Sequence, residues 1–266
     1  MPAALAPGPV LVFGGTTEGR QVAAWLGHTD YPFWYSTKSR VEMELPANGQ
    51  YRCEAFTEES LADFCRQHRV RGIVHASHPF AEQLHATIAH VSQRLGLPVG
   101  RVEREYPEHS THPLVHYADS YEEVVARLLE GNYELVLALS GVQTIGRLRE
   151  YWQQRRMLFR VLPREASMAL ARAAGFPVEG LIPAWPGADL AEEVQLIRRT
   201  GVQAVVTKES GESGFLSVKI ATALQAGVPI FIVRRPSLPA HFLSIRGEAE
   251  LLDFLYACMH GLTAGS

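Results

Sequence analysis

Short apolar segments alternate with longer amphipathic segments along most of the chain. The apolar segments are rich in β-branched and aromatic residues, as in buried parallel strands, and the segments between them carry apolar residues at helical spacing. The predicted strands are residues 10–13, 33–36, 51–55, 72–76, 99–102, 134–140, 158–162, 181–184, 204–207 and 230–233. The predicted helices are residues 20–26, 58–69, 81–95, 121–129, 164–174, 190–199, 217–225 and 248–260. This alternation predicts an α/β protein built from parallel βαβ units.

The number of predicted strands exceeds what one sheet usually holds, so we expect two Rossmann-like, doubly wound parallel-sheet domains. Residues 104–120 are polar and histidine-rich, contain Pro107 and Pro113, and lack apolar periodicity. Such a segment is typical of a linker. We therefore expect one domain over residues 1–115 and a second over residues 116–266.

Composition narrows the classes of protein that fit this pattern. With 266 residues, 47% of them apolar and 20% charged, the chain can bury a full core, and no apolar run is long enough to span a bilayer. The net charge of −3 gives no reason to expect nucleic acid as a partner. Cys53, Cys65 and Cys258 are widely spaced, as expected for reduced thiols. Residues 1–9 lack the features of a signal peptide, so we expect a cytoplasmic protein.

A glycine turn follows the first predicted strand. Gly14 and Gly15 precede Thr16, Thr17 and Glu18, where a helix begins. Glycines permit positive φ and close approach of a ligand, and a helix N-terminus offers N–H groups and a positive dipole to a phosphate. The turn therefore favours phosphate binding. It lacks the three-glycine dinucleotide fingerprint and the Walker pattern, so a turn that serves packing alone is the alternative.

The end of the second predicted strand bears on the choice of dinucleotide. In dinucleotide-binding domains it lies beside the adenosine ribose, where an acid selects the 2′-hydroxyl and cations accept a 2′-phosphate. Residues 36–40 contain two cations and three hydroxyls, and no acid occurs before Glu42. Ser36, Lys38 and Arg40 thus favour NADPH, with NADH as the second choice. The alternative is a solvated basic loop.

The fourth strand leads into Ser77, His78 and Pro79. Ligands of open α/β sheets bind at such strand ends, so His78 could hold a substrate carboxylate or supply a proton, with Ser77 beside it. The alternative is that Ser77 only caps a helix. The nearby His75, His85 and His90 come without a cysteine pair or an HExxH pattern, so we expect no metal site.

The second half of the chain offers its own anion-binding groups. Lys208 directly follows a predicted strand, and Ser210 and Gly211 come next in a glycine-rich loop that leads to a helix with Lys219. These residues could bind a substrate anion, and a Lys208–Glu209 surface pair is the alternative. A later strand delivers Arg234 and Arg235 to the same edge of the sheet, where guanidiniums can bind carboxylates.

Five motifs in order resemble the precorrin-6A reductase family of cobalamin biosynthesis, including its cobalt-precorrin-6A branch. They are the Gly-Gly-Thr-Thr-Glu-Gly-Arg turn, the Ala-Ser-His-Pro-Phe-Ala loop, the Arg-Val-Leu-Pro segment from Arg160, the Val-Thr-Lys-Glu-Ser-Gly loop with Lys219 downstream, and the Arg-Arg-Pro ending. The resemblance implies two Rossmann-like domains, a tetrapyrrole substrate held between them, and reduction of one macrocycle double bond by a pyridine nucleotide.

The chain departs from the family pattern at several positions. His75 stands where the family usually has Asp, Ser77 where it usually has Thr, and Arg104 precedes Glu105 where Arg-Pro is usual; residues 139–144 match the family loop only loosely. His75 could mark a relocated proton donor or a homologue with another substrate.

Together these features predict an NADPH-dependent precorrin-6A reductase. In it Gly14, Gly15, Thr16, Thr17 and Glu18 serve the pyrophosphate, and His78 is the candidate catalytic residue. Ser77, Lys208, Ser210, Gly211, Lys219 and Arg234 are expected to bind substrate. The alternative is a noncatalytic nucleotide-sensing module or a reductase of another substrate. We expect a monomer or homodimer without a membrane partner.

Overall fold

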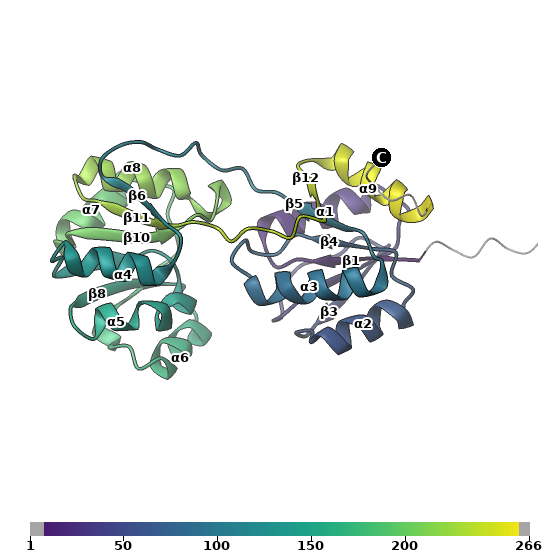
Figure 1. Cartoon of the computed structure of the whole chain (residues 1–266), viewed down its shortest axis with the longest axis horizontal. Helices are drawn as coiled ribbons and strands as arrows, with labels where there is room; N and C mark the ends of the chain where they lie inside the picture. The colour runs from purple at the N-terminus through teal and green to yellow at the C-terminus, as the bar shows by residue number, and fades with distance from the viewer. Residues whose placement is uncertain (1–7, 261–266) are drawn as a thin grey trace, which may run out of the picture. The chain divides into compact units, whose positions relative to one another are not determined.

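In the computed structural model, which describes residues 8–260, the strands form two separate six-stranded sheets with helices on both faces (Figure 1). The chain divides into two units. Unit 1 contains the residues up to Arg104 together with those from Pro236 onward, and unit 2 contains Glu105–Arg235. Each sheet is parallel throughout, so the predicted fold of two Rossmann-like α/β domains is confirmed.

Unit 1 has the strand order of a doubly wound dinucleotide-binding fold, β12-β5-β4-β1-β2-β3. Its strands are β1 (Val10–Phe13), β2 (Phe33–Thr37), β3 (Gly49–Cys53), β4 (Gly72–His75), β5 (Val99–Val102) and β12 (Phe242–Ile245). Helices α1 (Thr17–Gly27) and α9 (Glu248–His260) cover one face, and α2 (Glu58–Gln67) and α3 (Glu82–Leu95) cover the other (Figure 1).

The alternation of side chains along β1 explains the two helical layers of unit 1. Val10 and Val12 point into an apolar cluster with residues of α1 and α9, whereas Leu11 and Phe13 point into a second cluster with residues of α2 and α3. Since both faces of β1 are buried, its sequence is a continuous apolar run without polar alternation.

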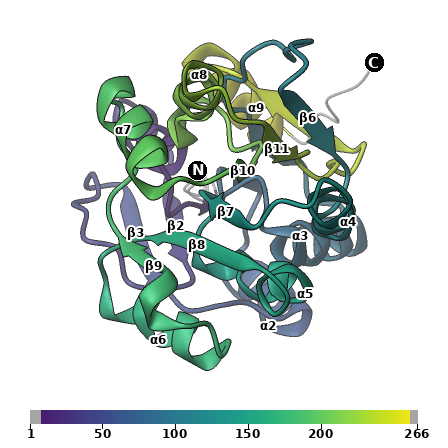
Figure 2. The ribbon, with the colours of Figure 1, turned by 90° about the vertical axis from the view of Figure 1, so that its left-hand side faces the viewer.

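Unit 2 repeats this architecture with the order β6-β11-β10-β7-β8-β9. Its strands are β6 (Val115–Ala118), β7 (Leu135–Ala138), β8 (Arg156–Val161), β9 (Leu181–Pro183), β10 (Ala204–Lys208) and β11 (Ile230–Val233). Helices α7 (Leu190–Thr200) and α8 (Leu216–Ala226) pack on one face. Helices α4 (Tyr121–Glu130), α5 (Arg149–Trp152) and α6 (Glu165–Ala173) lie on the other side of this sheet (Figure 2).

Two strands were not predicted from the sequence, and each lies at one edge of its sheet. β6 lies inside the segment expected to be a linker, and β12 follows a proline-rich stretch. Each is short and pairs with one neighbour only, β6 with β11 and β12 with β5. An edge strand buries less apolar surface than a central strand, so its sequence carries a weaker apolar signal.

The expected division of the chain needs correction for the same reason. The boundary was placed after residue 115 and the tail was assigned to the second domain. Instead the chain leaves unit 1 after Arg104, and β12 and α9 return to complete unit 1. Leu251, Phe254 and Leu255 of α9 are buried in the core of unit 1, and this burial is what holds the tail there.

The N-terminal segment and the possibility of a membrane span were also considered from the sequence. Most of the N-terminal segment read as a lead-in, residues 1–7, lies outside the described residues. Among the helices of residues 8–260, none has the length and apolar character needed to cross a membrane.

Candidate functional site

In both units the chemistry-bearing side chains gather at the carboxyl ends of the parallel strands. In unit 1 the chain runs from β1 to β2 on one side, and β4 lies on the other side of β1. In unit 2 the same reversal lies between β7 and β10. Open α/β sheets bind ligands in the crevice that such a reversal creates.

The glycine turn of unit 1 has the geometry of a phosphate cradle. Gly15 has a φ of +89°, and a Cβ built there meets only Thr37 Cγ2, at 3.7 Å. Gly14 is tighter, since a Cβ would lie 2.1 Å from the ring of Tyr35. At Gly19 a Cβ would lie 2.7 Å from Gly14 Cα. Two glycines thus let α1 pack closely against the turn, and Gly15 keeps its outer side open.

Thr16 has a structural task in this turn. Its Oγ1 accepts a hydrogen bond from the N–H of Gly19 at 3.0 Å, which caps α1, and donates one to the carbonyl of Ala76 at 2.6 Å. The N–H of Gly15 donates to the Tyr35 hydroxyl at 3.0 Å. Burial raises the pKa of Tyr35, so this hydroxyl stays protonated. The N–H of Thr17, in the first turn of α1, lacks an intrahelical acceptor and fits an incoming phosphate.

Glu18 would repel a phosphate if its charge were unbalanced. Its carboxylate forms an ion pair with Arg104 at 3.0 Å, and both side chains are largely buried. Arg104 lies two residues beyond β5, a partnership between distant segments that sequence reasoning missed. The pair offsets the negative charge of Glu18 beside the N-terminus of α1, so this carboxylate does not exclude an anion from the turn.

The loop after β2 presents the predicted cations to solvent. Ser36 is buried, and its carbonyl accepts the N–H of Gly14 at 3.0 Å. Thr37 Oγ1 donates to the carbonyl of Ser39 at 2.8 Å, and Tyr51 lies 2.6 Å from the same Oγ1, which shapes the loop. Lys38 and Arg40 are exposed. The backbone of Ser36 therefore ties this loop to the glycine turn.

The loop after β4 is held by side chains that bind its carbonyls. Buried Arg101, on β5, donates to the carbonyls of His75 at 3.3 Å and Ser77 at 3.0 Å. Thr16 binds the carbonyl between them. Ser77 Oγ lies 3.3 Å from His75 Nδ1. These hydrogen bonds hold the three residues that directly precede His78.

His75 is wholly buried, which argues against its role as a relocated proton donor. Burial, with the charge of Arg101, keeps the pKa of His75 well below its usual value, so the ring is neutral. His85 lies beside it, with ring centroids 4.9 Å apart, and burial lowers the pKa of His85 to about 4. An imidazole with no exposed surface is badly placed to protonate a substrate. No group of metal-binding side chains is found in the part of the chain that the structure describes.

His78 is half-buried at the head of this loop. Its Nδ1 accepts the N–H of Phe80 at 3.1 Å, which places the proton of the neutral ring on Nε2. The helix N-cap here is Ala81, so the alternative in which Ser77 caps α3 is wrong.

Unit 2 gathers three cations around one carboxylate. Arg160 on β8 donates to Glu193 on α7, and both side chains are buried. Lys219 on α8 is also buried, and burial with the charges of Arg160 and Lys208 lowers its pKa to about 7. Arg160, Lys208 and Lys219 thus bring positive charge near one another, which favours binding of a ligand carboxylate. Sequence reasoning named the lysines as binding residues, gave Arg160 only as part of a family motif, and missed Glu193.

The loop after Lys208 depends on two glycines. Gly211 has a φ of +74°, and a Cβ at Gly214 would lie 2.2 Å from Ser210 Oγ. Glu209 is buried, and its carboxylate accepts hydrogen bonds from His109 at 2.8 Å and from the N–H of Arg235 at 3.0 Å. Glu209 is therefore a buried carboxylate and not the exposed acid that a Lys208–Glu209 surface pair requires.

Arg234 takes a different place from the lysines. It is exposed, forms an ion pair with Asp119 at 2.7 Å, and lies 5.6 Å from the ring of Tyr117. An exposed pair of this kind is weak, so it leaves Arg234 able to exchange Asp119 for a ligand carboxylate.

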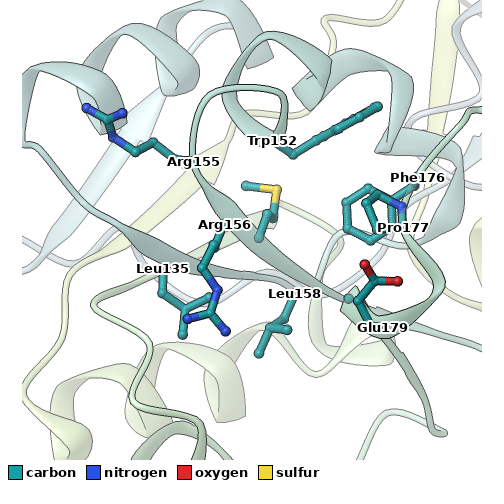
Figure 3. A pocket seen from close by; sticks show the side chains of 10 residues that line it. Leu135, Trp152, Arg155, Arg156, Leu158, Phe176, Pro177 and Glu179 are labelled. Atoms are coloured by element: carbon teal, nitrogen blue, oxygen red, sulfur yellow. The ribbon is translucent and has the colours of Figure 1, made fainter.

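A cavity of about 220 Å³ lies away from these residues (Figure 3). Leu135 and Arg156, which begin β7 and β8, line it together with Trp152, Phe176 and Glu179. It therefore belongs to the amino-terminal edge of the sheet of unit 2, opposite to the strand ends that carry Lys208.

Comparison with known proteins gives one consistent family. The family model described as precorrin-6x reductase CbiJ/CobK matches residues 9–255. The precorrin-6A reductase of Rhodococcus erythropolis is 32% identical over 240 residues, which are 86% of this chain and 90% of that protein. The cobalt-precorrin-6A reductase of Salmonella typhimurium is 28% identical over 236 residues, 86% of this chain and 88% of that protein.

A solved structure agrees with this fold. A structure described as CobK precorrin-6A reductase superposes with a TM-score of 0.77 at 22% identity, covering 97% of this chain and 100% of that one. At this level of identity the likeness concerns the architecture, two Rossmann-like α/β domains.

Proposed function

The chain belongs to the precorrin-6x reductase family, and from this we propose that it uses NADPH to reduce one double bond of the precorrin-6A macrocycle, or of its cobalt-containing form. Members of this family are oxidoreductases that act on a CH–CH bond of the macrocycle, in cobalamin biosynthesis. The observation that carries the proposal is the family match across both units, residues 9–255.

The glycine turn of unit 1 supports the nucleotide part of this proposal. Gly14, Gly15 and the first turn of α1 would hold the pyrophosphate, because Gly15 leaves the cradle open and Arg104 neutralises Glu18. Lys38 and Arg40 would meet the 2′-phosphate, and the turn lies beside their loop through the Gly14–Ser36 hydrogen bond. When bound, the reduced nicotinamide supplies the hydride.

The remaining residues would serve the macrocycle. Reduction of a double bond adds a hydride to one carbon and a proton to its neighbour, and His78 Nε2 is the candidate donor of that proton. Ser77 would bind substrate beside it. Substrate carboxylates would be bound in unit 2 by Lys208, by Lys219 with Arg160, and by Arg234. Ser210 and Gly211 shape the loop that carries Lys208.

Anaerobic incubation with NADPH and precorrin-6A, with and without cobalt in the macrocycle, tests the proposal. We expect oxidation of NADPH and a product heavier than the substrate by the mass of two hydrogens. Absorbance spectra measure the first and mass spectra the second. The cobalt arms report which form is the substrate. A protein that binds NADPH but oxidises none of it with either macrocycle would instead be the noncatalytic nucleotide-binding alternative.

A further inference from the structure

Trp185 is an exposed aromatic residue at the ligand-binding edge of unit 2. The large apolar side chains left exposed in residues 8–260 are Leu170, Val178, Trp185, Leu252 and Tyr256. Trp185 is 58% exposed. Among these five side chains it alone lies just beyond the carboxyl end of a strand, two residues after β9. At such an edge an exposed indole offers a ligand a large apolar face to stack on.

The backbone under Trp185 is fixed. The N–H of Ala184 donates to the carbonyl of Val161 at 2.9 Å, which extends the pairing of β8 with β9. Pro183 and Pro186 flank the segment and restrict its backbone. A Cβ at Gly187 would lie 2.9 Å from Glu193 Oε1, so the loop runs against that carboxylate. The indole is therefore presented from a rigid base, and little conformational entropy is lost when a ligand stacks on it.

Arg164 makes this position cationic as well as aromatic. Its guanidinium carbon lies 5.0 Å from the centre of the Trp185 ring, and the side chain is exposed. Neighbouring arginines pair with acids, as Arg172 does with Glu165. For Arg164 no ion pair with a carboxylate of residues 8–260 is found. A guanidinium beside an aromatic ring can bind a carboxylate while the ring stacks on the body of the same ligand.

The loop of Trp185 also connects to the buried cations. Glu193, which the loop touches at Gly187, pairs with Arg160, and both influence Lys219. A ligand that stacks on Trp185 thus lies at the strand edge where the cationic cluster of Arg160, Lys208 and Lys219 can meet its carboxylates. A ligand with a planar apolar body and carboxylate arms could contact both the Trp185 ring and the cations. A compact anion would contact the cations alone.

We propose that Trp185 and Arg164 form a platform that stacks against the planar face of a conjugated macrocycle and binds one of its carboxylates. The identity of the macrocycle as a tetrapyrrole rests on the proposed function. Trp185 then contributes to the affinity for the macrocycle rather than to the chemical step.

Quenching of tryptophan emission by uroporphyrin I, a planar tetrapyrrole with carboxylate arms, tests the platform. The full-length protein is titrated alongside Trp185→Ala, Trp185→Phe and Tyr256→Ala, which removes an aromatic side chain that is 57% exposed on α9. We expect Trp185→Ala to weaken binding about tenfold and Trp185→Phe to weaken it about two- to threefold. Tyr256→Ala should bind as the unaltered protein does.

Kinetics separate the platform from a structural role. We expect Trp185→Ala to raise KM for precorrin-6A by the same factor while kcat and the Kd of NADPH stay within about twofold. Unchanged KM and uroporphyrin affinity in Trp185→Ala overturn the platform. So does a Trp185→Ala variant that changes only the oligomeric state in sedimentation, because Trp185 would then be a subunit contact. If the unaltered protein fails to reduce precorrin-6A but binds uroporphyrin through Trp185, the proposed function fails and the platform stands.

Discussion

Lys219 shows how burial sets the properties of a single residue in unit 2. Its pKa is lowered to about 7, first by burial and then by the charges of Arg160 and Lys208, while Glu193 acts in the opposite direction. The amine of Lys219 therefore loses its proton at a much lower pH than an exposed lysine does. A carboxylate bound beside it would favour the charged form, so binding takes up a proton above pH 7.

This linkage predicts the pH dependence of ligand affinity. The Kd of uroporphyrin I should be constant below about pH 7 and rise by up to about tenfold per pH unit above it, because protonating Lys219 then costs free energy. In Lys219→Met the rise should vanish. The measurement is a fluorescence titration at several pH values. A rise of equal slope in both proteins would mean that Lys219 does not meet the ligand.

The same group gives the sign of one contribution to stability. Unfolded Lys219 has the ordinary lysine pKa of 10.5, so between about pH 7 and 10.5 the unfolded chain binds more protons there than the folded chain. The contribution of Lys219 to the free energy of unfolding therefore increases with pH across that window. Thermal unfolding of the unaltered protein and of Lys219→Met, measured at several pH values in this window, reports the contribution as a difference between their midpoints.

Lys38 and Arg40 carry the choice of nucleotide at the residue scale. Both are exposed in a loop without an acid before Glu42. We expect the double variant Lys38→Ala, Arg40→Ala to bind NADPH roughly ten- to a hundredfold more weakly, because charge-assisted contacts to the 2′-phosphate are lost. Calorimetry with NADH, which lacks this phosphate, should show nearly unchanged affinity. Tighter binding of NADH than NADPH by the unaltered protein would refute the assignment.

At the scale of elements, the turn between β1 and α1 separates two roles of glycine. Gly15→Val places a β-branched side chain at positive φ on the open side of the cradle, so we expect loss of NADPH binding with some loss of stability. Gly14→Ala drives a Cβ into Tyr35, so we expect destabilisation of about 1–3 kcal/mol. Calorimetry and thermal unfolding distinguish them. Retained NADPH binding in Gly15→Val would place the nucleotide elsewhere.

Elements with a buried apolar run were predictable from the sequence, and contacts between distant segments were not. β1 and β11 were placed correctly, since both faces of each are covered by helices. β6 escaped because its sequence, Val-His-Tyr-Ala, alternates weakly beside prolines. The glycine turn and Lys208 were found at strand ends by local pattern. The pairs Glu18–Arg104 and Arg160–Glu193 depend on the tertiary fold, and the one local hint was a charged residue, Arg160, inside an apolar strand.

At the scale of the whole molecule, the chain completes unit 2 before it returns to finish unit 1. After β5 the chain supplies β6 to unit 2, and after β11 it supplies β12 to unit 1. Unit 2 is therefore one continuous segment, Glu105–Arg235, whereas unit 1 needs both ends of the chain.

This arrangement of the chain predicts different behaviour of fragments. Residues 105–235 alone should unfold cooperatively on heating, since their sheet and core are complete. Residues 1–104 alone should not, because they lack β12 and the buried side chains of α9. Circular dichroism during thermal unfolding checks both. Cooperative unfolding of the 1–104 fragment would show that β12 and α9 are dispensable.

The central claim is that unit 1 binds the nucleotide and that Lys208 of unit 2 binds a carboxylate of the macrocycle, and Lys208→Met tests it most directly. The substitution keeps the aliphatic stem and removes the charge, so we expect kcat/KM for precorrin-6A to fall roughly ten- to a hundredfold. The Kd of NADPH, measured on the same sample, should stay within about twofold. Unchanged kcat/KM, or a loss of NADPH affinity in place of it, would contradict this division of tasks.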